Sequence, residues 1–348
     1  MLGFSIYFSH EPNYDYEKSL LDMGYKTIFT SIQIPEEEQK DPLDMLEHRL
    51  NKLSSESLNI IVDANPEVIN DQLFNLMSKY PSLQLIIRID HSVSLELVKE
   101  CVSNNVKVCL NASTISQEDL KQFHEAKIPK SQMIYCHNYY PRPETGLSQS
   151  HVLKQNQLIR SFDNEATIYG FIPGTSFRGP IHKGLPTLES ARGTTVIDAS
   201  YQLLDSGVNH IIVGDHYISL FEASRLYKAI MNQHFELPLK WFNDSYQTEL
   251  FKRHTNRPDV AEQVIRSMHS RTECQRTIPI EENLDRPEGT ITIDNKLYGR
   301  YEGEVQITKV NLPKTDSVNV VAQIDSTYIK ELKYIKGNHT FEFVKGEE

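Results

Sequence analysis

The stretch QLIIRIDHSVSLELVKECVSNNVKVCLN, residues 84–111, contains the pattern that decides the fold. Two runs within it, 84–90 and 106–111, are rich in Ile, Val and Leu with little polar alternation, which is typical of parallel strands buried on both faces. Residues 95–102, between the two runs, have the apolar spacing of an amphipathic helix. The stretch therefore predicts one strand–helix–strand unit of a parallel sheet.

The same alternation extends over the first two thirds of the chain. The other predicted strands cover 3–9, 27–32, 59–63, 133–137, 166–172 and 210–215, and the other predicted helices cover 15–23, 41–53, 68–80, 117–125, 148–161, 195–204 and 220–231. Asp41, Ser116 and Ser148 are suitable helix caps. Eight strands, each followed by a helix, predict a (β/α)8 TIM barrel. A doubly wound sheet is the alternative, but no GxGxxG turn follows the first strand.

The pattern changes after residue 236. We predict irregular chain over 237–253, a helix over 257–269 that Pro258 opens, and short strands at 290–293, 304–310, 318–324, 332–335 and 340–344. Turn residues separate the strands, as is usual in a small all-β barrel or sandwich. The predicted domains are therefore a catalytic barrel over 1–236 and a linker helix with a β-domain over 237–348.

The charge balance restricts the partners. The 348 residues carry 36 Lys and Arg against 47 Asp and Glu, a formal net charge of -11. Nucleic acids and anionic membranes are polyanions, so neither is an expected partner. An anionic small molecule would need cations gathered locally. A homo-oligomer is left open.

The cysteines and the N-terminus indicate the compartment. Cys101, Cys109, Cys136 and Cys274 show no CxxC spacing, so we expect reduced thiols and no metal held by them. The first residues lack the basic region and cleavage site of a signal peptide, and no run of about 18 apolar residues occurs. We therefore expect a cytoplasmic protein without a cofactor.

The carboxyl ends of barrel strands carry the reactive side chains of TIM-barrel enzymes. This rule selects Asp63, Asp90 and Asp215, which end the third, fourth and eighth predicted strands, together with Asn111 and His137 at the ends of the fifth and sixth. Three carboxylates at one rim favour acid/base chemistry, although each Asp could instead cap the following helix.

Two other kinds of chemistry are weaker interpretations of the same rim. His10, His91, His137 and His216 would suit a metal-dependent hydrolase, but such sites usually show an HxH or HExxH spacing, which is absent. A Schiff-base enzyme needs a lysine near the carboxyl end of a strand, and Lys107 lies near a strand start. A protein that binds sugar without cleaving it is the non-enzymatic alternative.

Two loops are specialised. The stretch HNYYPRPETGL, residues 137–147, is aromatic and stiffened by prolines, and its Arg142 can bind an oxyanion. The loop after the seventh predicted strand contains Arg178, His182 and Lys183 beside Gly184, whose backbone can approach an anion. Loops after strands 7 and 8 are the frequent phosphate site of TIM barrels. The spacing therefore indicates an enzyme for a small, phosphorylated ligand.

These loops also resemble a known family. The stretches HNYYPRPETGL (137–147), FIPG (171–174) and GLPTLE (184–189), with GTITIDN (289–295) and YGRY (298–301), are similar to those of the 6-phospho-N-acetylmuramidase family, MupG type. The resemblance covers essentially the whole chain and implies a TIM barrel followed by a cyclophilin-like β-domain. It also implies a cytoplasmic exo-glycosidase that cleaves N-acetylmuramic acid 6-phosphate from N-acetylglucosamine during cell-wall recycling.

The resemblance gives the candidates expected roles. Glycoside cleavage needs two carboxyl groups, for which Asp90 and Asp63 are the first pair, with Asp215 as a further candidate. The expected substrate-binding residues are Asn111, His137, Asn138, Tyr139, Tyr140, Arg142, Thr145, Arg178, His182, Lys183, Gly184, Glu189, Tyr298 and Arg300. Among them, the tyrosines at 139 and 140 would form a sugar platform, an asparagine would bond the N-acetyl group, and the cations would hold the phosphate and the lactyl carboxylate.

Overall fold

The computed structural model describes residues 1–8, 10, 12–33, 42–53, 57–90, 93–281 and 284–346. The chain divides into two compact units, Met1–Ser224 and Arg225–Glu348. Within the described ranges, no helix is both long enough and apolar enough to cross a membrane.

Eight parallel strands close into a barrel in the first unit, in chain order. The strands are β1 (Leu2–Ser5), β2 (Thr27–Ser31), β3 (Asn59–Asp63), β4 (Gln84–Ile89), β5 (Lys107–Asn111), β6 (Met133–Cys136), β7 (Ile168–Ile172) and β8 (His210–Val213). β1 pairs with both β2 and β8, which closes the ring. The predicted TIM-like barrel is confirmed.

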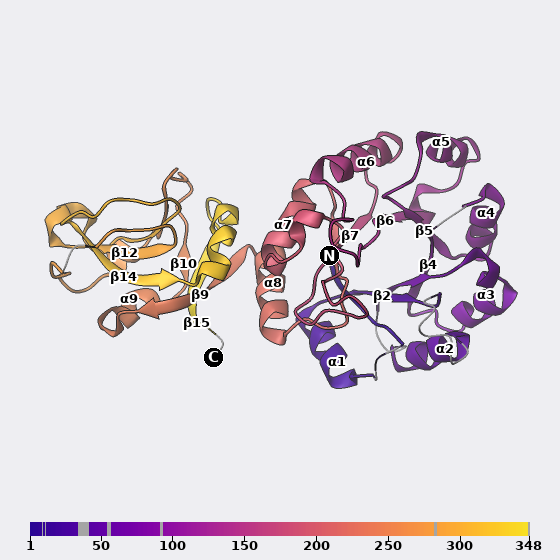
Figure 1. The fold of residues 1–348 in the computed structure, drawn as a ribbon, viewed down its shortest axis with the longest axis horizontal. Coiled ribbons are helices and arrows are strands. Elements are labelled where there is room, and N and C mark those ends of the chain that lie inside the picture. Colours follow the sequence, from indigo (N-terminus) through magenta and orange to yellow (C-terminus); the bar gives the residue numbers. More distant parts are fainter. Residues whose placement is uncertain are drawn as a thin grey trace. The chain divides into compact units, whose positions relative to one another are not determined.

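A helix follows each strand, and Figure 1 shows these helices around the barrel. They are α1 (Tyr14–Met23), α2 (Pro42–Leu53), α3 (Asp71–Ser78), α4 (Leu95–Ser103), α5 (Gln117–Glu125), α6 (Gln149–Phe162), α7 (Val196–Asp205) and α8 (Leu220–Asn232). The predicted caps Ser116 and Ser148 each accept a backbone N–H at the start of their helix, which satisfies a donor that has no partner within the helix. The predicted cap Asp41 lies outside the described residues.

The barrel interior determines which strand residues reach the mouth. Ile61, Ile86 and Cys109 belong to the buried core of the barrel, together with aromatic residues of β2 and β7. Side chains along a strand alternate between its two faces, so the residues two positions further, Asp63, Arg88 and Asn111, also point inward. The inward face therefore changes from apolar to polar at the carboxyl end.

The second unit consists mostly of one seven-stranded sheet, in the order β10-β15-β9-β14-β12-β13-β11. The strands are β9 (His234–Phe242), β10 (His254–Thr255), β11 (Val264–Arg266), β12 (Thr290–Asp294), β13 (Val305–Thr308), β14 (Val318–Ile324) and β15 (Thr340–Lys345). An isolated bridge joins Asn256 to Ser267, directly after β10 and β11, so the two edges of the sheet are bonded there. The cyclophilin-like topology stays a prediction.

Three sequence predictions in this unit are wrong. The stretch 237–253, predicted as irregular, contains most of β9. This strand tolerates Pro238 because the pairing of β9 with β14 shifts register beside it. The stretch 257–269, predicted as a helix, contains β11. Of the three residues of this strand only Ile265 is buried, which matches the alternation of a strand. The stretch 332–335, predicted as a strand, falls mainly in the 3-10 helix η7 (Ser326–Tyr334), which Asp325 caps. The predicted domain division at residue 236 falls within β9.

A buried ion pair lies within the second unit. Arg225 and Glu331 are both 0% exposed, and their charged atoms are 2.5 Å apart. The Arg225 guanidinium also lies 4.2 Å from the ring centre of Tyr328 and donates to the carbonyl of Glu236. A charge buried this deeply depends on its partner, because removing the partner leaves it uncompensated.

Replacing Glu331 with Gln should therefore lower the free energy of unfolding by about 3–5 kcal/mol. The matched control is Asp22→Asn, which breaks the exposed Lys18–Asp22 pair and should change the free energy by no more than about 1 kcal/mol. Denaturant titration of both variants makes the comparison. An equal change in the free energy of unfolding in both variants would contradict the claim that the buried pair stabilises the second unit more than an exposed pair does.

Candidate active site

The Arg88 side chain organises the mouth of the barrel. Arg88 is 4% exposed, and its guanidinium pairs with Asp63 at 2.5 Å and with Asp90 at 3.1 Å. It also donates to the side-chain oxygen of Asn138. Burial by itself would lower the pKa of Arg88, but the Asp63 and Asp90 carboxylates raise it overall, so the guanidinium stays charged. The structure thus brings together two of the predicted carboxylates around a cation.

Asp63 is held on both carboxylate oxygens. Arg88 pairs with Oδ1, while Ser31 donates to Oδ2 at 3.1 Å and Gln33 donates to it at 2.6 Å. Asp63 is only 6% exposed. These partners come from β2, β4 and the residues that follow β2, so the position of this carboxylate is fixed by the barrel itself.

Asp90 is the more accessible carboxylate, with 23% of its side chain exposed. Its Oδ1 accepts from Asn111 Nδ2 at 2.6 Å and from Arg88 at 3.1 Å. Asn111 is oriented in turn, because the backbone N–H of Ser113 donates to its Oδ1 at 2.9 Å. A cavity of about 280 Å³ lies beside this carboxylate, lined also by Asn111 and Thr114.

His137 lies beneath the site in a chain of hydrogen bonds. Asn156 donates its amide to Ser206 O, so its Oδ1 accepts from His137 Nε2 at 2.9 Å. His137 Nδ1 then accepts from the Ser113 hydroxyl at 3.2 Å, and that hydroxyl accepts from the backbone N–H of Asn138. Burial lowers the pKa of His137 to about 4, so the ring is neutral. This fully buried residue bonds the Ser113 hydroxyl, which in turn positions Asn138.

Aromatic rings form the floor of the mouth. Tyr139 packs edge-on against Phe29 and Phe171, with ring centres 6.1 and 5.2 Å apart. Tyr7, which follows β1, donates its hydroxyl to Gly214 O at 2.6 Å, and burial raises its pKa well above the usual value. Tyr140 is partly buried, and its backbone N–H donates to Pro186 O. The predicted Tyr139 and Tyr140 therefore lie at the mouth. Tyr7, which the sequence analysis did not select, lies beside them.

Asp215 anchors the loop after β7. Its two carboxylate oxygens accept from the backbone N–H groups of Gly174, Arg178 and Leu185 at 2.8 to 3.1 Å. Burial nonetheless raises the pKa of Asp215 above its ordinary value, while these bonds lower it. A side chain at Gly174 would lie 2.2 Å from the carbonyl of Tyr217, so the loop needs glycine there. These bonds place the predicted cation Arg178 over the Tyr7 ring, at 4.2 Å.

Glu189 anchors the loop after β6. It accepts from the backbone N–H groups of Glu144 and Gly146 at 2.9 and 2.8 Å and pairs with Arg192 at 2.7 Å. The hydrogen bond from Arg192 is the largest influence that lowers the pKa of Glu189, to about 2. Glu189 thus holds the two predicted loops together as a permanent anion.

The remaining predicted anion-binding residues occupy these two loops. Arg142, Thr145, His182 and Lys183 are exposed, and Gly184 is buried with φ of 80°. Thr145 uses its hydroxyl to close the turn, by donating to Arg142 O at 2.6 Å. Tyr298 and Arg300 belong to the second unit, where both are exposed in η6 (Lys296–Tyr301). The predicted rim residue His91 lies outside the described residues.

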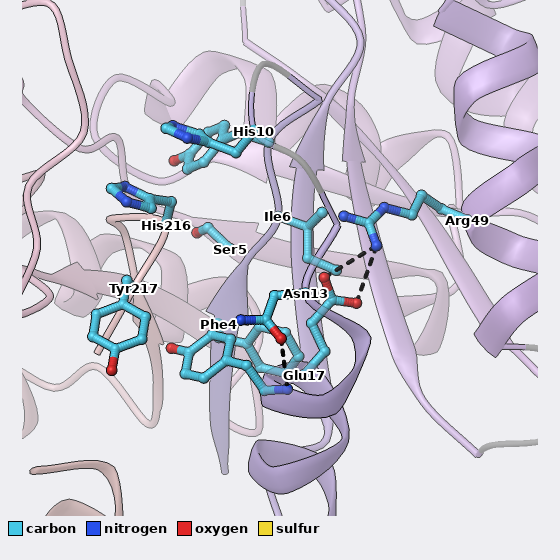
Figure 2. A pocket seen from close by; sticks show the side chains of 11 residues that line it. Phe4, Ser5, Ile6, His10, Asn13, Glu17, Arg49, His216 and Tyr217 are labelled. Carbon is cyan, nitrogen blue, oxygen red and sulfur yellow. Dashed lines mark hydrogen bonds and ion pairs between the residues drawn. The ribbon is translucent and has the colours of Figure 1, made fainter. Parts of the chain in front are cut away.

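A second cavity, of about 250 Å³, opens beside β1 and β8. Figure 2 shows His10 and His216 on one side of it and the paired Glu17 and Arg49 on the other. The nearest atoms of that ion pair are 3.0 Å apart, and both residues are buried. None of these four residues is placed in the substrate site by the sequence analysis.

Sequence reasoning missed Arg88, Tyr7 and the pair formed by Ser31 and Gln33. Arg88 had a readable signal, because a charged residue two positions after an inward-facing Ile in an apolar strand must have buried partners. Tyr7, Ser31 and Gln33 gave no such signal in the sequence, because their roles depend on which strands are neighbours in the barrel.

Among the described residues, one group could hold a metal ion. His234, Glu236 and Glu342 of the second unit place donor atoms within 4.8 Å of one another. Lys228 pairs with Glu236 at 2.5 Å and Arg253 with Glu342 at 3.9 Å. These ammonium and guanidinium groups already balance the carboxylates, so the group fits an ion-pair network.

Comparisons with known proteins agree with the architecture. A family model described as 6-phospho-N-acetylmuramidase, N-terminal, matches residues 2–228, and its C-terminal counterpart matches residues 235–344. A conserved Enterococcus faecalis protein of unknown function is 31% identical, with a TM-score of 0.85, over 99% of this chain and 96% of that chain. An uncharacterized B. cereus protein, 23% identical with a TM-score of 0.73, covers 99% of each chain and shares the fold. No curated protein matches.

The neutral state of His137 predicts a pH dependence of stability. The unfolded chain takes up a proton on this ring near pH 6.5, whereas the folded chain does so only near pH 4. The free energy of unfolding should therefore fall as the pH decreases through this window, by at most about 3 kcal/mol from this residue. Denaturant titration at pH 7.5 and 5.0 should show a smaller fall for His137→Gln than for the wild type.

The control for that measurement is His124→Gln, which removes an exposed histidine at the end of α5. In this variant the free energy of unfolding should fall between pH 7.5 and 5.0 as much as in the wild type. If it fell as much in His137→Gln too, His137 would not be the buried neutral residue that the hydrogen bonds require.

Proposed function

Because this chain belongs to the 6-phospho-N-acetylmuramidase family, we propose that it is an exo-acting glycosidase that hydrolyses the bond between N-acetylmuramic acid 6-phosphate and N-acetylglucosamine. Its substrate is the disaccharide that enters during cell-wall recycling, and it acts in the cytoplasm without a cofactor. The observation that carries the proposal is the pair of carboxylates around Arg88 at the barrel mouth.

Glycoside hydrolysis fits this pair. One carboxyl group protonates the leaving oxygen, and the other acts as a nucleophile or as a base for water. Asp63 is held on both oxygens by Arg88, Ser31 and Gln33, so we assign it the role of nucleophile or base. Asp90 is the more exposed of the two and lies beside the cavity of about 280 Å³, so we assign it the contact with the leaving oxygen. Asp215 and Glu189 act as loop anchors in this scheme, since backbone N–H groups occupy them.

The surrounding residues bind and orient the sugar. Tyr139, held edge-on by two phenylalanines, and Tyr140 present ring faces to the pyranose. Asn111 and Asn138 are the candidates for the N-acetyl group, and both are already fixed by bonds to Asp90 and Arg88. The loops after β6 and β7 contribute Arg142, Arg178, His182 and Lys183 to the phosphate and the lactyl carboxylate. A protein of net charge -11 needs such a local group of cations for an anionic substrate.

The direct test of this function is a paired incubation. The protein should release two monosaccharides from the 6-phosphorylated muramic disaccharide and little from its unphosphorylated counterpart, because the loop cations bind the phosphate. Mass spectrometry of the products measures how much of each disaccharide is cleaved. Equal cleavage of both disaccharides would contradict the phosphate specificity, and cleavage of neither would contradict the function.

Replacing Asp90 or Asp63 with Asn should reduce turnover of the phosphorylated disaccharide by about 10³-fold or more, because the proton donor or the charged carboxylate is lost. Asp71→Asn, at the exposed start of α3, is the matched control and should turn over normally. Circular dichroism confirms that each variant is folded. Near-normal turnover in both site variants would refute this pair.

A further inference from the structure

Four nitrogen-bearing side chains gather where the ends of β1, β7 and β8 meet. His10 follows β1, Arg178 and His182 follow β7, and His216 follows β8. The rings of His10 and His216 are stacked, with centres 4.2 Å apart and planes inclined by 9°. Figure 2 shows the two side chains on the same side of the cavity. Both rings line the 250 Å³ cavity beside β1, and so does Tyr7, which carries Arg178 over its face.

Three of the four groups act electrostatically on the fourth, His216. Burial lowers the pKa of His216 most, and the charges of His10, Arg178 and His182 each lower it further. The Arg178 guanidinium and the ring nitrogens of the histidines can together offer several hydrogen-bond donors to an anionic oxygen.

The neighbouring carboxylates already have other hydrogen-bond or ion-pair partners. Asp215, adjacent to His216 in the chain, accepts three backbone N–H groups of the β7 loop. Glu17 is the carboxylate among the described residues that line the cavity, and it is paired with Arg49 at 3.0 Å. Glu17 is thus paired outside the group, whereas the Asp215 charge acts on Arg178 and offsets part of the positive charge of the group.

His216 also has an unused hydrogen-bonding atom. Its Nδ1 is buried and has no hydrogen-bond partner among the described residues. Buried polar atoms in folded proteins are almost always bonded to protein, water or ligand. The atom therefore marks a place where a ligand oxygen, or a water that a ligand replaces, is expected.

We propose that His216 and His10, together with Arg178 and His182, form the subsite for the phosphate group of a sugar 6-phosphate. This inference rests on the proposed function and deepens it, because it names two residues that the sequence analysis left outside the substrate site. A doubly charged phosphate matches the group better than a singly charged carboxylate does. The loops after β7 and β8, which supply three of the four residues, are also where phosphates bind in many TIM barrels.

The anion could come from the phosphate or from the lactyl carboxylate of a muramic sugar, and binding measurements separate the two. Isothermal titration calorimetry would use N-acetylglucosamine 6-phosphate, which has only the phosphate, and N-acetylmuramic acid, which has only the carboxylate. For the phosphorylated sugar, His216→Phe should bind at least tenfold more weakly than the wild type, because the ring shape is kept while both nitrogens are lost. N-acetylmuramic acid should bind both proteins equally.

His124→Phe is the matched control, because it makes the same replacement at an exposed site in the last turn of α5. Helices of a TIM barrel run opposite to the strands, so this turn lies at the end away from the mouth. The control should bind both sugars as the wild type does. His10→Phe and the smaller His216→Asn should weaken binding of the phosphorylated sugar as well, which guards against a fold defect in one variant.

Unchanged affinity of His216→Phe and His216→Asn for N-acetylglucosamine 6-phosphate would overturn the subsite. A selective loss of N-acetylmuramic acid binding would also overturn it, by assigning the residues to the carboxylate. These measurements do not depend on cleavage. A protein that binds the phosphorylated sugar through His216 but leaves the disaccharide intact would refute the proposed function and keep this site.

Discussion

A guanidinium buried in the mouth of an apolar barrel is the constraint on which the rest of the site depends. Arg88 points inward from β4 above a core of aliphatic and aromatic side chains, where an unpaired charge would cost several kcal/mol. Asp63 and Asp90 offset that cost, and Asn138 completes the set of acceptors. The two carboxylates are therefore held near each other because both serve the same cation.

The support for this group extends through the barrel wall. Asn138 is fixed by the Ser113 hydroxyl, which donates to the buried His137 ring, and His137 is fixed by Asn156 of α6. Ser113 also orients Asn111, the partner of Asp90. One serine thus connects both asparagines of the site. Such a hydrogen-bonded network keeps the side chains in place before a substrate arrives, which is the condition for effective positioning.

Carboxylates serve two purposes at this rim. Asp63 and Asp90 face a cation, whereas Asp215 and Glu189 accept backbone N–H groups and hold the loops after β7 and β6. Strand position alone cannot separate these purposes, because an anchor and a reacting group can occupy equivalent strand ends. The separation appears only in the hydrogen-bond partners. Anchored in this way, the loop after β7 holds Arg178 over the Tyr7 ring.

The barrel could be predicted from the sequence because its strands are continuous apolar runs and its helices have caps and apolar spacing. The second unit was harder, since Pro238 obscured the long strand β9 and short apolar runs do not distinguish a strand from a 3-10 helix. The rule of strand ends found Asp63 and Asp90. It could not find Tyr7, and it placed His10 and His216 at the rim without showing that they stack, because their contact follows from the pairing of β1 with β8.

The most direct measurement is a crystal structure of the Asp90→Asn variant with the 6-phosphorylated muramic disaccharide. We expect the glycosidic oxygen to lie within hydrogen-bond distance of residue 90, over the Arg88 group, with Tyr139 beneath the sugar. A disaccharide bound away from the Asp63–Arg88–Asp90 group, with its glycosidic bond out of reach of both positions, would contradict the assignment of these carboxylates to cleavage.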